Sequence, residues 1–228
     1  MHFSQLDQWA CEDSLIHRRD ARAKILLLLI FLATVSLTAP GPQFLGFVVL
    51  CLAAILAARL PVLGILGRAA AVLPFSMTFA AISWLGGDSR RAAEMLAKSY
   101  ISAAAAVTVV AATRLPNLLR GMEMLGAPPL LVVVIQFLYR YLFVLVDQGQ
   151  RMRNAALCRG NGWPKAAGAL SVLFARSHAR AEAIHRAMLS RGYDGHFPVL
   201  QSQRFGPADW VFLIGGAIGS AGVYAASR

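Results

Sequence analysis

The sequence predicts an all-α membrane protein with about five transmembrane helices and a cytoplasmic module of long helices. The first observation is composition: hydrophobic residues make up 57% of the 228 residues and the mean hydropathy is +0.58, beyond ordinary soluble usage. The second is that several apolar runs approach the length that spans a bilayer. The third is that no short alternation of apolar and polar residues indicates a β-barrel.

The charge balance agrees with this class. The chain has 22 Lys and Arg against 11 Asp and Glu, a formal net charge of +11. We interpret the excess as cytoplasmic loops that follow the positive-inside rule. Nucleic-acid binding would need exposed aromatics among the basic residues or a known module, and neither is found, so no nucleic-acid partner is expected. Cys11, Cys51 and Cys158 have no metal or disulfide spacing.

Apolar segments follow one another along the chain, at 24–39, 43–60, 69–86, 95–112, 130–146 and 209–226. The polar, acidic first 20 residues are not typical of a cleaved signal peptide. The stretch LTAPGP predicts a tight turn between the first two segments, and Pro74 lies in the third. Gly215 and Gly219 form a GxxxG pair in the last, which either admits a neighbouring helix or reflects the abundance of glycine in membrane helices.

Lys and Arg residues set the expected orientation. They precede the first segment, separate the second from the third and follow the fourth. The N-terminus is therefore expected in the cytoplasm, and four spans return the chain there near residue 113. Arg90 and Arg91 break this pattern, and Asp88 and Glu94 partly offset them.

The segment 130–146 decides the architecture. As a fifth span it would send residues 148–206 outside, and that stretch holds nine Lys and Arg against two acidic residues. Arg140, near its middle, would also cost at least roughly 2.5–3.5 kcal/mol inside the bilayer. We therefore expect this segment on the cytoplasmic side, as the front half of a long helix whose apolar surface is covered by protein partners.

The expected parts are an N-terminal segment with a four-helix membrane region, a cytoplasmic insertion, and a C-terminal transmembrane helix, at residues 1–113, 114–206 and 207–228. In the insertion, Thr113 is predicted to cap a short helix that ends at the turn-forming stretch GAPP. A long helix is predicted over 129–159, ending at Gly160, and a third over 164–191, ending at Gly192.

Both long helices are predicted to end in Arg-Gly, at Arg159-Gly160 and Arg191-Gly192. Glycine is the commonest helix stop, and a cation near a helix C-terminus is favourable, so one interpretation is that these are ordinary helix ends. The neighbours favour more, since each arginine shares a helix face with small residues and further arginines: Arg151, Ala155 and Arg159 on one helix, and Arg176, Arg180, Ala187 and Arg191 on the other. Arginine is suited to carboxylates, whereas Glu182 is expected to pair locally with Arg186 or His178.

The stretches RYLFVLVDQGQRMRNAALCRG (140–160), ARSHARAEAIHRAMLSRGYDG (175–195) and SLIHRRDARAKI (14–25) resemble the transmembrane T component of energy-coupling factor (ECF) transporters, of CbiQ type. The resemblance covers nearly the whole chain. The family signature is a pair of Ala-Arg-Gly or Ala-Arg-Ser motifs, and here Cys158 and Ser190 stand before the arginines. Both are small, so the packing is expected to survive. The resemblance implies that the insertion is a cytoplasmic coupling module.

The resemblance further implies a non-catalytic importer subunit in the bacterial cytoplasmic (inner) membrane. Two ABC ATPase subunits would bind Mg-ATP, and each coupling arginine would dock in an acidic groove of one of them. A separate S component in the membrane would bind cobalt, or in a related importer nickel or a vitamin, so this chain would bind no cofactor or metal. The expected coupling residues are Arg159, Gly160, Arg191, Gly192, Ala156 and Ala187, supported by Arg151, Arg176, Arg180 and Glu182.

His2, Cys11, Asp13 and His17 would permit a metal site, but we interpret them as polar residues at the membrane surface. A membrane enzyme would need clustered acids or a Ser/His pair at membrane depth, and a chain that hydrolyses ATP would need a phosphate-binding motif; neither is found. A stand-alone permease would need polar residues around a midplane cavity, and the candidates are Ser76, Thr78, Ser99, Ser102 and Thr108.

Overall fold

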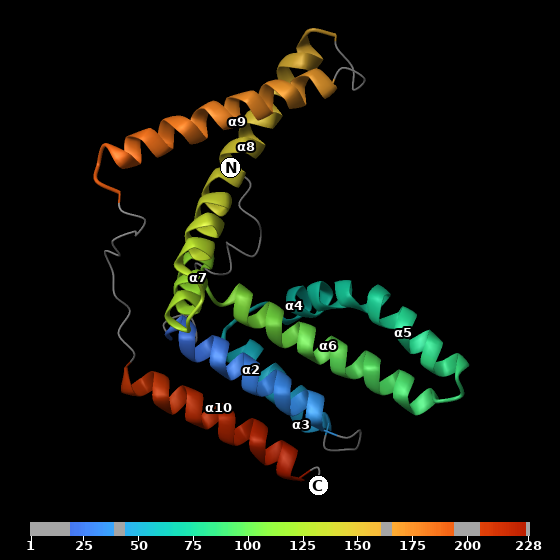
Figure 1. Ribbon diagram of the computed structural model, residues 1–228. Helices are drawn as coiled ribbons and strands as arrows, with labels where there is room; N and C mark the ends of the chain where they lie inside the picture. The colour runs from blue at the N-terminus through green and yellow to red at the C-terminus, as the bar shows by residue number, and fades with distance from the viewer. Residues whose placement is uncertain (1–18, 39–43, 161–165, 194–205, 227–228) are drawn as a thin grey trace. The chain divides into compact units, whose positions relative to one another are not determined.

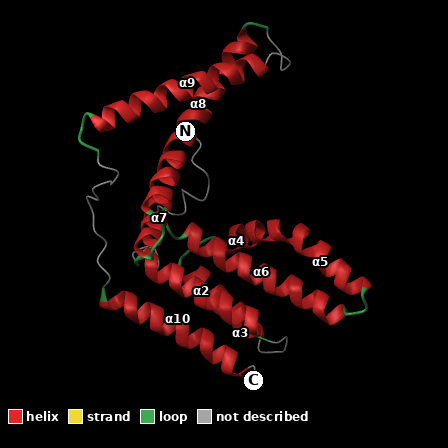
Figure 2. Cartoon of the chain, in the orientation of Figure 1, coloured by secondary structure: helices red, strands yellow, loops and turns green. Residues whose placement is uncertain are grey.

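The computed structural model describes residues 19–38, 44–160, 166–193 and 206–226, and every regular element in these ranges is a helix (Figures 1 and 2). The predicted all-α class is confirmed. In chain order the elements are α2 (Ala21–Leu37), α3 (Phe44–Ala57), α4 (Val62–Ala69), the 3₁₀ turn η1 (Ala70–Val72), α5 (Leu73–Leu85), α6 (Ser89–Ala111), α7 (Leu115–Met124), α8 (Pro129–Cys158), α9 (Ala166–Leu189) and α10 (Pro207–Ala226).

Among the described residues, four helical stretches are long and apolar enough to cross a membrane: Val62–Leu85, Ser89–Ala111, Pro129–Cys158 and Pro207–Ala225. The helix α2 has 17 residues and α3 has 14, so both are shorter than a typical span of about 20 residues. The predicted turn between them lies mostly outside the described residues. The length and composition of these helices indicate a multi-pass membrane protein.

Pro74 explains why the third apolar segment is not one continuous helix. The chain forms α4, then the 3₁₀ turn over Ala70–Val72, and α5 starts again at Leu73 with Pro74 in its first turn. Proline has no backbone N–H and its ring collides with the carbonyl one turn earlier, so it is tolerated at a helix start and disfavoured inside one. The segment predicted at 69–86 is thus the second part of a longer, interrupted stretch.

The helices α2 to α7 pack with α10 into one compact unit, the bundle unit. Phe47 of α3, Val35 of α2 and Ile101 of α6 are buried in its core. Figure 1 shows α10 running beside α2, and the contact is close because a Cβ on Gly216 would lie 2.4 Å from Leu27 Cδ1. Of the GxxxG pair, Gly215 faces open space and Gly219 meets Leu50 at 3.4 Å, so Gly216 makes the closer approach.

The helix α7 belongs to the bundle unit. It packs against α2, where a Cβ on Gly121 would lie 3.0 Å from Ala21 Cβ. The prediction that Thr113 caps this helix is wrong, because the N-cap residue is Arg114 and no side chain caps it. Pro116 lies in the first turn, where its missing N–H leaves no helical hydrogen bond unmade.

The helices α8 and α9 form a second compact unit, the hairpin unit. The prediction of a long helix over 129–159 is confirmed by α8, and that of a third helix over 164–191 by α9. Pro129 lies at the start of α8 and the helix runs for 30 residues, about 45 Å. The helix α9 packs against α8 and then diverges from it (Figure 1).

Candidate functional site

The C-terminus of α8 is built by Arg159 and Gly160. The Arg159 N–H donates to the Ala156 carbonyl at 3.2 Å, and the Gly160 N–H to the Leu157 carbonyl at 3.0 Å. Gly160 has φ +66°, the left-handed conformation that glycine adopts without a Cβ clash. The helix therefore stops at this glycine, as its sequence predicts, and leaves Arg159 in the final turn.

The C-terminus of α9 has the same geometry. The Gly192 N–H donates to the Leu189 carbonyl at 3.0 Å and the Tyr193 N–H to the Met188 carbonyl at 3.1 Å, the two bonds of a Schellman motif. Gly192 has φ +78°. The Ser190 hydroxyl donates to the Ala187 carbonyl at 2.9 Å, so the residue before the arginine folds back on its own helix and leaves the end compact.

The arginines at both ends are exposed. Among the described residues, no carboxylate lies within ion-pair distance of Arg159, Arg176, Arg180 or Arg191. The carboxylates of the hairpin unit that the structure describes have other partners: Asp147 pairs with Arg151 at 2.7 Å, and Glu182 lies 3.5 Å from Arg186 and 3.6 Å from His178. Glu182 thus contacts both of the partners that its helical spacing offers.

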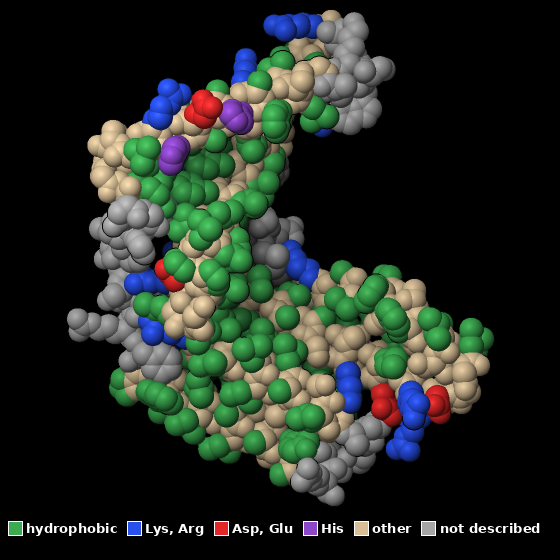
Figure 3. Space-filling view, in the orientation of Figure 1, with side chains coloured by type: hydrophobic (Ala, Val, Ile, Leu, Met, Phe, Trp, Pro, Cys, Tyr) green, Lys and Arg blue, Asp and Glu red, His purple; other side chains and the backbone are tan. Residues whose placement is uncertain are grey.

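The arginine stripe of α9 lies beside a half-buried stripe. The half-buried residues recur at helical spacing: Leu173, Ser177, Ile184 and Met188. One step around the helix lie exposed residues: Arg176, Arg180, Ala187 and Arg191. On α8, Ala156 is half-buried while Arg151, Ala155 and Arg159 are exposed. Figure 3 shows Lys, Arg and His side chains along the solvent-facing side of α9. Each helix therefore uses one face for packing and presents an adjacent basic face to solvent.

The two Arg-Gly ends lie at different ends of α9. Arg159 closes the helix before it, whereas Arg191 follows its last turn. Since α9 has 24 residues, about 36 Å of helix separates the two ends along the chain. One compact binding pocket does not extend over that length, so the two arginines do not belong to one such pocket.

A charged cluster in the bundle unit was missed by the sequence analysis. It consists of Asp20, Lys24, Thr113 and Asp209, all buried. The Lys24 ammonium donates to the Ala112 carbonyl at 3.0 Å and to the Thr113 hydroxyl at 3.2 Å. Asp209 accepts from the Asp20 N–H at 3.2 Å and from the Gly206 N–H at 3.0 Å. The cluster ties the start of α2 to the end of α6 and the start of α10.

The sequence did contain local signals for the two acidic residues of this cluster, because each lies at the start of a helix. Asp20 is the N-cap of α2 and accepts from the Arg22 N–H at 3.0 Å. Asp209 follows Pro207 in the first turn of α10, which is a favourable place for an acidic residue. Their pairing across the fold had no local signal, because 189 residues separate the two positions.

Within the described part of the chain, no three His, Cys, Asp or Glu side chains lie close enough to hold a metal ion. His2, Cys11, Asp13 and His17 lie outside the described residues. His178 and His185 are both exposed on α9.

The fold and the site define a multi-pass membrane protein that carries an exposed, basic helical hairpin. The CbiQ family model, described as cobalt transport protein, matches residues 12–202. The chain belongs to this family. Members of this family are generally non-catalytic.

Two relatives were found in Methanocaldococcus jannaschii, both uncharacterized proteins. One is 26% identical over 116 residues, which cover 48% of this chain and 40% of the relative. The other is 34% identical over 84 residues, covering 34% of this chain and 31% of the relative. The chain thus matches less than half the length of each relative.

Proposed function

We propose that this chain is the scaffold and coupling subunit of an ECF-type ABC importer for cobalt ions. In this role the hairpin unit transmits the motion of two ATPase subunits to a separate, metal-binding S component. The observation that carries the proposal is the pair of Arg-Gly helix ends, which have the same left-handed glycine stop and present arginines without a carboxylate partner among the described residues.

The charge of the hairpin unit supports acidic partners. Residues 126–202 hold nine Lys and Arg against three Asp and Glu, a difference of six positive charges. A guanidinium offers a planar fork of donors that matches a carboxylate in two-point contact. An arginine held at a rigid helix end keeps a fixed direction. If the partner groove that binds this arginine is displaced, the helix therefore moves with it. Complementary acidic grooves on the ATPases would satisfy both ends.

The two-partner part of the proposal is supported by the length of α9. A separation of about 36 Å along the helix is long enough for two subunits to be engaged by one chain. When the ATPase subunits approach or separate during their cycle, the two acidic grooves that bind the arginines move relative to each other. The hairpin unit, fixed at both ends, would convert that relative motion into a tilt or rotation of α8.

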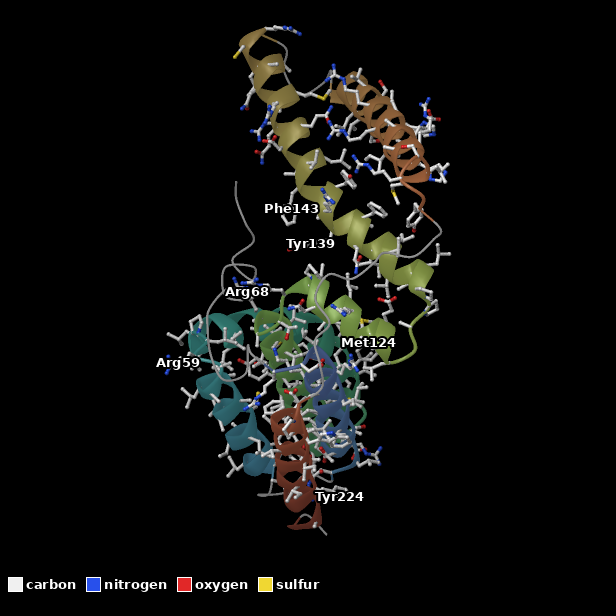
Figure 4. The ribbon with its side chains drawn as sticks, turned by 90° about the vertical axis from the view of Figure 1, so that its left-hand side faces the viewer. Arg59, Arg68, Met124, Tyr139, Phe143 and Tyr224 are labelled. Atoms are coloured by element: carbon white, nitrogen blue, oxygen red, sulfur yellow. The ribbon has the colours of Figure 1, made fainter. Side chains whose placement is uncertain are left out.

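The front half of α8 offers the surface that would meet the S component. Its exposed apolar side chains are Leu130, Leu131, Val134, Leu138, Leu142, Phe143 and Val146, and Figure 3 shows hydrophobic side chains gathered along this helix. Tyr139 and Phe143, labelled in Figure 4, meet edge to face with ring centroids 5.2 Å apart. A surface this apolar is covered by a partner or by lipid. The Arg140 guanidinium lies 5.9 Å from the centre of the Tyr141 ring. This cation–π contact stabilises the charge beside the apolar face.

The proposed orientation places the N-terminus in the cytoplasm of a bacterial cell, with the chain in its inner membrane. Contacts between helix ends support it, because the start of α2, the ends of α3 and α6 and the start of α10 meet at one end of the bundle unit. Arg59 and Arg68 lie toward this end, and Tyr224 lies near the other (Figure 4). At the α5–α6 turn, Asp88 pairs with Arg91 at 3.1 Å, which offsets part of the basic charge there.

The test is the double variant Arg159→Ala/Arg191→Ala in the complete transporter. Cobalt uptake is expected to fall at least about tenfold, because removing one partner of a buried charge pair costs several kcal/mol. The ATPase subunits should either detach during co-purification or hydrolyse ATP without uptake. The matched control is Arg153→Ala/Arg186→Ala, which removes the same charge from exposed positions in the same helices. Equal behaviour of the two double variants would contradict the docking role.

The alternative of a stand-alone permease is disfavoured by the hydroxyl groups it would need. Four of the five candidates, Ser76, Thr78, Ser99 and Thr108, each donate to a carbonyl of their own helix, which leaves little polar surface for a transport path. Cobalt uptake into vesicles that contain only the purified chain would support the permease and contradict the coupling subunit. Uptake by the full complex, with nickel and cobalt as competitors, distinguishes the cargo.

A further inference from the structure

A half-open cavity of about 570 Å³ lies in the bundle unit, between α2, α3, α6 and α10. Its wall is mostly apolar, with Leu27 and Phe31 from α2, Leu50 from α3 and Phe212 from α10. Small side chains such as Ala54, together with Gly215, keep it open, and a Cβ on Gly215 would meet no atom within 4 Å. The volume lies within the usual range for ligand pockets, about 300–1,000 Å³.

The cavity is apolar along its length and charged at one end. Arg19 and Lys24 line that end, at the start of α2. The ammonium of Lys24 already donates to the Ala112 carbonyl and the Thr113 hydroxyl, so it is held in place by the protein. No carboxylate described by the structure lies within ion-pair distance of Arg19.

The charges around this end leave a positive excess. Asp20 and Asp209 are buried beside Lys24, and Arg22 lies 3.8 Å from Asp20. Among the described residues of this cluster and the adjoining cavity wall, three cations, Arg19, Arg22 and Lys24, are therefore matched by two carboxylates. Since Lys24 and Arg22 are the ones next to the carboxylates, Arg19 carries the excess, and it lies at the cavity where an anionic group would be received.

The size and chemistry of the cavity argue against two other occupants. A helix with its side chains is about 10 Å wide and rises 1.5 Å per residue, so about five residues would fill 570 Å³, little more than one turn. A transported metal ion would need several ligands, and Cys51 is the one metal-ligating side chain of the described wall. A flexible chain of methylene groups with an anionic head fits both the apolar wall and the basic end.

We propose that this cavity binds one acyl chain of an anionic phospholipid, with the phosphate at the Arg19 guanidinium. Basic pockets between membrane helices are suited to anionic head groups, and each buried methylene adds to the affinity. The lipid would fill the space between four helices, three of which, α2, α6 and α10, are joined at one end by the charged cluster. This inference concerns the bundle unit and stands apart from the proposed docking of the hairpin arginines.

The test measures retained lipid by native mass spectrometry of the purified chain after exchange into detergent with phosphatidylglycerol, phosphatidylcholine or inorganic phosphate. The wild-type chain is expected to retain one phosphatidylglycerol in preference to phosphatidylcholine. Gly215→Leu should reduce retention by more than about tenfold, since it displaces several methylenes. The control Gly222→Leu, two turns further on the same helix and also facing open space, should retain lipid as the wild type does.

The head group is tested with Arg19→Gln, which should lower the preference for phosphatidylglycerol about fivefold while phosphatidylcholine binding stays the same. The control Arg114→Gln removes a charge from an exposed residue at the same end of the bundle, outside the cavity wall, and should keep the preference. Displacement of the lipid by inorganic phosphate at millimolar concentration would overturn the proposal, because the acyl chain would then be unnecessary.

Folding of the filling variant is monitored by helix content and gel filtration, and Ala54→Phe, from the opposite wall on α3, serves as a second filling variant. Equal retention by wild type and both filling variants would overturn the proposal. Detection of a different occupant would also overturn the proposal. It is tested by alkylation of Gly215→Cys in a chain whose three native cysteines are replaced by serine. Alkylation of that cysteine should be slowed by phosphatidylglycerol; protection by the partner subunits alone would assign the cavity to a protein segment.

Discussion

The charged cluster of the bundle unit and the Arg-Gly ends of the hairpin unit both place charges at helix ends, in opposite environments. Lys24 is 2% exposed and its ammonium is bonded within the unit. Arg159 and Arg191 are exposed and have no carboxylate partner in the described part of the chain. A buried charge without partners is costly, so the first arrangement fixes the fold. An exposed charge on a rigid helix end costs little and stays available to another protein.

The largest expected effect is the loss of the buried ammonium. Lys24→Met leaves Asp20 and Asp209 buried beside an apolar side chain, and removing one member of such a group destabilises by about 3–5 kcal/mol. For a chain of this size we expect the melting temperature in detergent to fall by about 10 °C. Differential scanning fluorimetry or circular dichroism measures it.

The control for this prediction is Lys98→Met. Lys98, which is half-buried, also donates to a backbone carbonyl, that of Ser36, in a solvent-exposed hydrogen bond of 3.1 Å. Its loss should change stability by less than about 1 kcal/mol. If the Lys24→Met and Lys98→Met variants have the same melting temperature, the buried cluster contributes no more to stability than a surface contact does. The contrast between the two units is then wrong.

An intermediate effect is expected at the stop of α9. Gly192 has φ +78° and its missing Cβ faces open space, so Gly192→Ala costs about 1–2 kcal/mol through backbone strain alone. Hydrogen exchange should show faster opening of the last turn around Met188 and Leu189, and coupling of ATP hydrolysis to cobalt uptake should weaken because Arg191 loses its fixed direction.

Gly168→Ala is the matched control for Gly192→Ala. Gly168 lies in the first turn of α9, also faces open space and has no positive φ, so alanine there should be neutral or stabilise the helix by up to about 1 kcal/mol. Unchanged coupling in Gly192→Ala, together with faster exchange, would mean that the position of Arg191 at a rigid end is unimportant.

The two units also differ in how well the sequence predicts them. The hairpin unit was predicted almost to the residue because its signals are local: Pro129 opens α8, and Gly160 and Gly192 close the two helices. The glycine stops, the arginine positions and the local pairing of Glu182 depend on neighbours within a few residues.

The bundle unit was predicted less well because its decisive contacts are distant in sequence. Lys24 meets Thr113 across 89 residues, and nothing near Thr113 distinguishes an acceptor for lysine from a helix cap. Likewise Gly216 rather than Gly215 faces α2, since the packing of two particular helices selects which glycine of a glycine-rich segment lies in the contact.

The smallest effect is expected for Glu182→Gln. Its partners Arg186 and His178 are on the same exposed helix, with side chains more than half exposed, and such surface pairs contribute about 0.5 kcal/mol or less. The melting temperature and the uptake of the complete transporter should therefore match the wild type. If uptake instead falls as far as in the double arginine variant, Glu182 contacts the ATPase side itself. The basic face of α9 would then bind through a mixed-charge surface rather than through arginines alone.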